Sequence, residues 1–211
     1  MGYAAKNWGA AVAYSFGQNV GFSGTPFSQS LVIRDPQNGV NTENAISTNS
    51  IGLSAYWQPS TSGWVPSISA GWGYTTYSYG PGSTILTAIA PNPSPTPSLI
   101  NQTAVTQSWY VGLQWADAFV KGNTFGMAVG QPTFVTADAH TGHDPNDGNY
   151  AWEWWYKIQV TDHISVTPAI FYLSNPSGQL ANVNGTGTTG NDGSAGVFNN
   201  FGALIKTTFK F

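Results

Sequence analysis

The clearest structural signal in this chain of 211 residues lies at residues 150–160, which read YAWEWWYKIQV. Apolar side chains occupy every second position, and the alternate positions include Glu153 and Lys157. A period of two predicts a β-strand with one apolar and one mixed face. Ordinary strands have about five or six residues, whereas a tilted strand that crosses a bilayer needs about 9–11. This segment therefore predicts a strand that is long enough to span a membrane.

The same alternation recurs along the whole chain, and most of the predicted strands are long. Together with residues 150–160, it predicts eight strands, at residues 7–16, 50–57, 64–75, 108–115, 124–130, 164–172 and 201–211. Glycine and proline interrupt every candidate helix, so no helix is expected. The chain is therefore predicted to be all-β and antiparallel, with eight strands visible.

The connections between these strands alternate between long and short. The long ones are residues 17–47, 80–104, 132–148 and 175–197, and the short ones are residues 58–63, 117–122 and 161–162. Short turns at one end and long loops at the other are typical of a transmembrane β-barrel of the outer membrane. This arrangement places both ends of the chain on the periplasmic side.

The composition excludes several other classes of protein. Charged residues make up 7% of the chain, against about 25% in an ordinary soluble domain. The chain contains no run of 18 apolar residues, so no transmembrane helix is expected. The net charge is −3 and the few Lys and Arg residues are scattered, so no nucleic-acid partner is expected. The chain has no cysteine, which excludes disulfides and thiol chemistry.

The charged side chains of the strands fall on the face opposite the apolar one. A charge facing lipid at mid-membrane costs about 2–4 kcal/mol, which explains this segregation. The predicted pore-lining residues are Glu153, Lys157, Lys206, Lys210, Tyr110 and Gln114. The predicted membrane-interface aromatics, which lie near strand ends, are Trp8, Trp57, Trp64, Trp115 and Tyr172.

Metal binding and catalysis are not expected from this sequence. His140, His143 and Asp144 are weak candidates for a metal site, because their loop has an ordinary turn composition and the two histidines lack the helical spacing of a zinc pair. No histidine faces a serine on a predicted strand, so no catalytic group is assigned and the chain is not expected to be an enzyme. No cofactor is predicted.

The hairpin at residues 152–178 resembles the last hairpin of the carbohydrate-selective porins of the OprB type. The matching positions are Glu153, Pro168, Tyr172, Asn175 and Pro176. The sequences EWWYK and TFGMAVGQPTFV resemble the cyanobacterial branch of that family, also called iron-uptake porins. The resemblance implies passive diffusion of small hydrophilic solutes, such as sugars and inorganic ions including iron, across the cell outer membrane. It also implies a homotrimer surrounded by outer-membrane lipid.

The end of the chain, FGALIKTTFKF, resembles the signal that the barrel-assembly machinery reads. Ile205, Phe209 and Phe211 carry it, and polar Thr207 departs from the pattern. Full members of the family have sixteen strands, and the cyanobacterial branch adds a surface-layer-homology domain. Residues 1–211 are therefore expected to be one porin domain that is incomplete at its N-terminus, without a signal peptide or surface-layer-homology domain, and to form about half of a sixteen-stranded barrel.

Two other functions remain open from the sequence. One is a small eight-stranded structural or adhesion barrel with a filled lumen. The other is a secreted carbohydrate-binding β-sandwich. The predicted inner face is dominated by small residues, and this suits the wall of a wide pore better than a lumen packed with side chains.

Overall fold

The computed structural model describes residues 1–18, 24–25, 46–61, 63–79, 103–137, 144–178 and 199–210. These residues contain nine β-strands: β1 (Gly2–Ala4), β2 (Trp8–Gln18), β3 (Ile46–Trp57), β4 (Ser67–Tyr79), β5 (Thr103–Ala116), β6 (Thr124–Ala137), β7 (Tyr150–Thr161), β8 (Ile164–Ser174) and β9 (Asn199–Phe209). In this part of the chain, no helix is long and apolar enough to cross a membrane.

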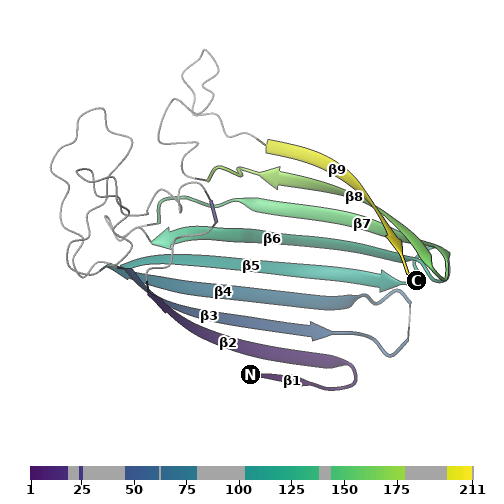
Figure 1. The fold of residues 1–211 in the computed structure, drawn as a ribbon, viewed down its shortest axis with the longest axis horizontal. Helices are drawn as coiled ribbons and strands as arrows, with labels where there is room; N and C mark the ends of the chain where they lie inside the picture. The colour runs from purple at the N-terminus through teal and green to yellow at the C-terminus, as the bar shows by residue number, and fades with distance from the viewer. Residues whose placement is uncertain are drawn as a thin grey trace, which may run out of the picture.

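The nine strands form a single antiparallel sheet in which each strand pairs with the next one along the chain (Figure 1). The prediction of an all-β antiparallel fold is thus confirmed. The predicted number of eight strands is one too few, because β1 pairs with Gly9–Ala11 of β2 as an additional short strand. Its three residues are too few to show an alternation in the sequence.

Strand β6 continues well beyond its predicted end at Gly130. Pro132 follows, and proline usually ends a strand because it has no N–H to donate. The sheet accommodates it with a bulge: Trp109 faces Gln131, and Gln107 faces Phe134, so β6 has one extra residue there. The predicted loop at residues 132–148 therefore begins later, and β6 reaches Ala137.

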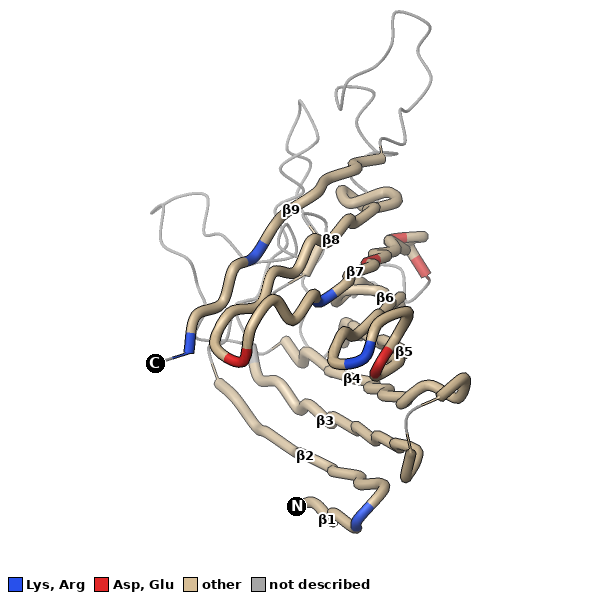
Figure 2. Tube along the Cα trace, turned by 90° about the vertical axis from the view of Figure 1, so that its right-hand side faces the viewer, with Lys and Arg blue, Asp and Glu red and all other residues tan. Residues whose placement is uncertain are grey.

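The sheet is curved, and its strands follow an arc when they are viewed along their length (Figure 2). Hollows of about 610 and 300 Å³ are lined mainly by one set of alternating residues, among them Ser54, Thr75 and Tyr110. This set therefore forms the concave face. The opposite, convex face exposes large apolar side chains over most of the sheet, including Val12, Leu53 and Ile170.

The sheet is not closed into a barrel. Among the described residues, β9 pairs with β8 alone, and β2 has no partner beyond β1 on its other side. Each free edge leaves backbone N–H and C=O groups without a strand partner, which a lipid environment does not tolerate.

Candidate functional site

The concave face is built from rows of residues that the strand register aligns across the sheet. One row contains Gly9, Tyr56, Ser69, Gly112, Ala128, Glu153, Phe171 and Gly202. The adjoining row contains Ala11, Ser54, Gly71, Tyr110, Gly130, Ala151, Leu173 and Asn200. Small residues dominate both rows, and Glu153 is their one charged member.

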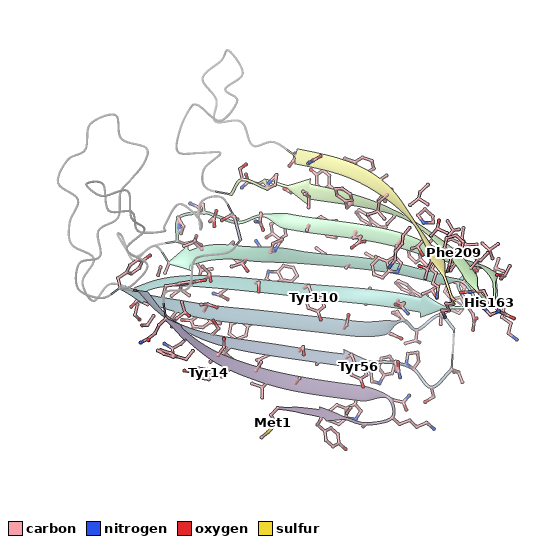
Figure 3. The ribbon with its side chains drawn as sticks, viewed as in Figure 1. Met1, Tyr14, Tyr56, Tyr110, His163 and Phe209 are labelled. Atoms are coloured by element: carbon pink, nitrogen blue, oxygen red, sulfur yellow. The ribbon has the colours of Figure 1, made fainter. Side chains whose placement is uncertain are left out.

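The large aromatic side chains of this face lie flat over glycines of the neighbouring strands. Tyr56 lies on β3 and Tyr110 on β5 (Figure 3). A Cβ atom at Gly9 would be 2.5 Å from Cε1 of Tyr56, and a Cβ atom at Gly71 would collide with the Tyr110 ring. The same relation joins Trp155 to Gly126 and Phe171 to Gly202. These rings therefore cover the wall, and the missing glycine side chains make room for them.

The hollow of about 610 Å³ lies over the middle of the sheet, between these rings. Tyr110, Glu153 and Phe171 contribute to its lining, together with the hydroxyls of Ser54 and Ser108. Ring surfaces, hydroxyl groups and one carboxylate give it both apolar and hydrogen-bonding contacts. Such a surface can contact polar solutes without holding them through a deep, enclosed cavity.

The other predicted lining charges lie nearer the short turns. Lys206 pairs with Thr167, and the β7–β8 register places Lys157 on the opposite side of the same threonine. Lys157 is four positions after Glu153, which is about 13 Å along a strand. Each charge is therefore presented separately on the concave side.

Gln114 lies on the same face as these charges. It faces Ser67 on β4 and Gly126 on β6. Lys210 follows β9, and its backbone N–H donates to the carbonyl oxygen of His163 over 2.8 Å. Lining of a pore by these residues stays a prediction.

The similarity of the chain to known proteins identifies its family. The chain matches the model of the carbohydrate-selective porin, OprB family, over residues 4–209. The chain belongs to the OprB family. This is a family of outer-membrane channels and not of enzymes, and its β-barrel fits the antiparallel sheet with one apolar face.

An uncharacterized protein of Synechocystis sp. (strain ATCC 27184 / PCC 6803 / Kazusa) is 32% identical to this OprB-family chain over 122 residues. The match covers 57% of the chain but 20% of the Synechocystis protein, so the chain spans a small part of this relative. A cyanobacterial relative is consistent with the cyanobacterial branch of the family. No solved structure is significantly similar to the chain.

The predicted interface aromatics of this OprB-family chain lie at both ends of the sheet. Trp8 faces Trp57 on the convex side beside the short turns, and the indole N–H of Trp115 donates to the carbonyl oxygen of Trp64 over 2.9 Å. Tyr172 lies near the opposite end, close to the end of β8. Trp64 precedes β4, although the sequence placed it inside a strand.

Two of the three residues of the predicted assembly signal are described. Ile205 and Phe209 lie on β9 on the convex side, and Ile205 is 75% exposed. Phe211 lies outside the described residues. β9 is also the strand whose outer edge has no partner among the described residues.

Of the three weak candidates for a metal site, the structure describes only Asp144. His140 and His143 lie outside the described residues. A carboxylate oxygen of Asp144 accepts a hydrogen bond from the Asn146 backbone N–H over 2.8 Å, which is a local turn contact. The described part of the chain contains no group of three or more His, Cys, Asp or Glu residues that could hold a metal ion.

Sequence reasoning missed the role of Asp147, which is fully buried at the long-loop end of the sheet. One of its carboxylate oxygens accepts hydrogen bonds from the Thr25 hydroxyl over 2.5 Å and from the Val135 backbone N–H over 2.9 Å. The Thr25 backbone N–H also donates to the carbonyl oxygen of Thr133 over 3.1 Å. β6 pairs with β7 as far as Gly130, so Thr25 and Asp147 bind β6 beyond the end of that pairing.

A third segment reaches the same point. Gly178 has φ +55°, and a Cβ atom there would collide with the Asp147 carboxylate. The Asn175 side-chain amide donates to the carbonyl oxygen of Gly148 over 2.9 Å. Asp147 thus joins three segments that follow β2, β6 and β8. The turn-forming residues around positions 147 and 178 are the available sequence signal, but it does not indicate which segments meet.

Proposed function

We propose that this chain forms the wall of a pore in the cell outer membrane, with the concave face toward the lumen. The observation that carries the proposal is the separation of the two faces. The convex face exposes large apolar side chains, whereas the strand charges Glu153, Lys157 and Lys206 belong to the concave face. A lipid-facing band and a polar lumen need this arrangement.

The proposed activity is passive diffusion of small hydrophilic solutes, namely sugars and inorganic ions including iron. The family supports sugars as the substrate class. The flat rings of Tyr56 and Tyr110 and the many small residues support a lumen that holds water. A few fixed charges would bias the flow of ions, and neither catalysis nor energy coupling is part of the proposal.

We also propose that a functional pore contains more wall than the nine strands, with residues 1–211 as an incomplete porin domain. The proposal is supported by the two edges of the sheet, which have no strand partner among the described residues. An isolated barrel of eight or nine strands would need bulky inner side chains to fill it. The rings on the concave face instead lie over glycines. The family resemblance supports a homotrimer as part of the proposal, and the exposed Ile205 and Phe209 support recognition by the barrel-assembly machinery.

The test is to refold the chain into lipid vesicles and to measure the uptake of neutral sugars of increasing size, with planar-bilayer conductance in parallel. We expect ohmic current steps and sugar uptake that falls with solute size. A folded, inserted chain that passes neither ions nor sugars would contradict a pore made by these residues. That outcome would favour the filled structural barrel. A chain that stays soluble and folded without lipid would favour the β-sandwich.

A further inference from the structure

The short turn between β5 and β6 presents an aromatic side chain in an unfavourable backbone conformation. Phe119 has φ +61° and is 89% exposed, and the adjacent Val120 is also exposed. The left-handed region is costly for a bulky residue, whereas asparagine and glycine adopt it more readily. Strain at an exposed apolar residue points to a role in contact with something outside the chain.

Phe119 forms one side of an apolar hollow of about 720 Å³. The other aromatic residues of its lining are Trp64, Trp115 and Phe125, and the lining also includes Gly63, Ala116, Asp117 and Ala118. The Trp115 and Phe125 ring centroids are 5.6 Å apart, and the Phe119 ring meets Phe125 edge-on at 6.5 Å. We call this set of four aromatic residues the turn notch.

Hydrogen bonds hold the walls of the turn notch in place. The Trp115 indole donates to the Trp64 carbonyl oxygen and so joins the turn before β4 to the end of β5. The Tyr156 hydroxyl donates to the Ala118 carbonyl oxygen over 3.0 Å. The Gly122 backbone N–H donates to the Asp117 carboxylate over 2.7 Å. The hollow is therefore formed before any partner arrives.

The turn notch continues the convex face. Trp115 and Phe125 face each other across β5 and β6 on that side, and Trp64, which is 97% exposed, extends the apolar surface past the strand ends. Lys121 is exposed in the same turn as Phe119. An apolar hollow on a turn that also carries an exposed lysine, two residues after Phe119, complements a molecule with a hydrocarbon chain and a phosphate.

We propose that the turn notch binds one phospholipid of the leaflet nearest the short turns, with an acyl chain against Phe119 and Trp64 and the phosphate near Lys121. The inference rests on the proposed membrane placement. It goes beyond a general aromatic belt, because it assigns a discrete site with one lipid and one lysine. A second copy of the chain is the other possible occupant, and the experiment separates the two.

The test is native mass spectrometry of the refolded chain in detergent with added dioleoyl phosphatidylethanolamine. Removing a buried aromatic contact should weaken lipid binding about tenfold. Phe119→Asn should thus lose the retained lipid, while its backbone conformation stays allowed. The matched control is Tyr150→Asn, which removes an exposed aromatic from the convex side at the other end of the sheet and should retain lipid like the unchanged chain.

A second arm tests the phosphate contact. The unchanged chain should retain the phospholipid better than dioleoylglycerol, which lacks the phosphate, and Lys121→Gln should remove this preference. Folding of every variant is checked by its mobility on a gel before and after heating.

Each other outcome overturns a specific part of the reasoning. If folded Phe119→Asn retains lipid as well as the unchanged chain, the turn notch is not a lipid site, and the pore proposal is unaffected. If Phe119→Asn changes the number of subunits in the detected complex but not the amount of bound lipid, the turn notch is an interface between copies of the chain and not a lipid site. If the unchanged chain does not insert into vesicles at all, the membrane placement itself fails.

Discussion

Replacing Asp147 with alanine should open the junction of the three segments at the long-loop end of the sheet. Two donors then lose a buried acceptor: the Val135 backbone N–H and the Thr25 hydroxyl. An unsatisfied buried donor costs about 1–3 kcal/mol. The hydroxyl of Thr25 can turn to another acceptor, so we expect a total loss of about 2–3 kcal/mol in the free energy of local opening.

The direct assay is hydrogen exchange at the Val135 amide in detergent or lipid. A loss of about 2–3 kcal/mol corresponds to exchange that is roughly 30- to 150-fold faster. The control is Asp144→Ala, because Asp144 is exposed and accepts a hydrogen bond within its own turn. In Asp144→Ala the exchange rate of the Val135 amide should rise less than about threefold, because most surface substitutions change stability only slightly.

Equal exchange at Val135 in the two variants would refute the assignment of Asp147 as the anchor. Thr25→Val provides an independent check. It removes the Thr25 hydroxyl as a donor to Asp147 and keeps the bond from Val135, so its effect should be smaller than that of Asp147→Ala. If the junction also borders the pore mouth, Asp147→Ala should increase the noise of the open current, and Asp144→Ala should not.

Three further predictions follow from the two faces of the sheet. Gly126→Ala should push the Trp155 ring away from the wall and lower the conductance. In the control Gly52→Ala, the new Cβ atom meets no atom closer than 4.0 Å, so the conductance should stay unchanged. Equal conductance in the two variants would mean that the position of the Trp155 ring does not affect the current. Glu153→Gln should shift the reversal potential in a KCl gradient toward anions and Lys157→Gln toward cations, and both shifts should shrink at high salt because fixed charges are screened. Ile170→Arg on the convex face should cost about 2–4 kcal/mol in a urea titration of the inserted protein. Ser54→Arg on the concave face should cost much less, and equal costs would contradict the assignment of the faces.

The fold could be predicted from sequence because a period of two, kept over many residues, fixes both the strand and its two faces. Residues 150–160 are an example, since they match β7 closely. The two elements that the sequence predicted wrongly, the number of strands and the end of β6, have local causes. β1 is too short to show a period. β6 passes Pro132 through a bulge, and this depends on its partner strand.

The candidate site was predicted less completely. Alternation placed Glu153, Lys157 and Tyr110 on one face, but the position of a ring over a glycine depends on the register between strands. The contact of Tyr110 with Gly71 joins residues 39 positions apart in sequence. The Asp147 junction joins loop residues that follow no period, and Phe119 is unusual only because of its backbone conformation. The first two relations join separate segments of the chain, and the backbone conformation of Phe119 leaves no mark in the residue pattern.

The order of the sheet also affects how the protein is made. Every strand pairs with its neighbour in sequence, so no pairing has to reach past an intervening strand. Alternate hairpins close over short turns and the others over long loops, and the entropic cost of closing a loop rises only slowly with its length. The wall can therefore grow one hairpin at a time as the chain is delivered, with unpaired backbone limited to the first edge and the newest strand. The final seam between the first and last strands is the one contact that has to wait for the whole wall. Substitutions within a hairpin should thus alter an early step of assembly, and substitutions at the seam should trap a nearly complete intermediate.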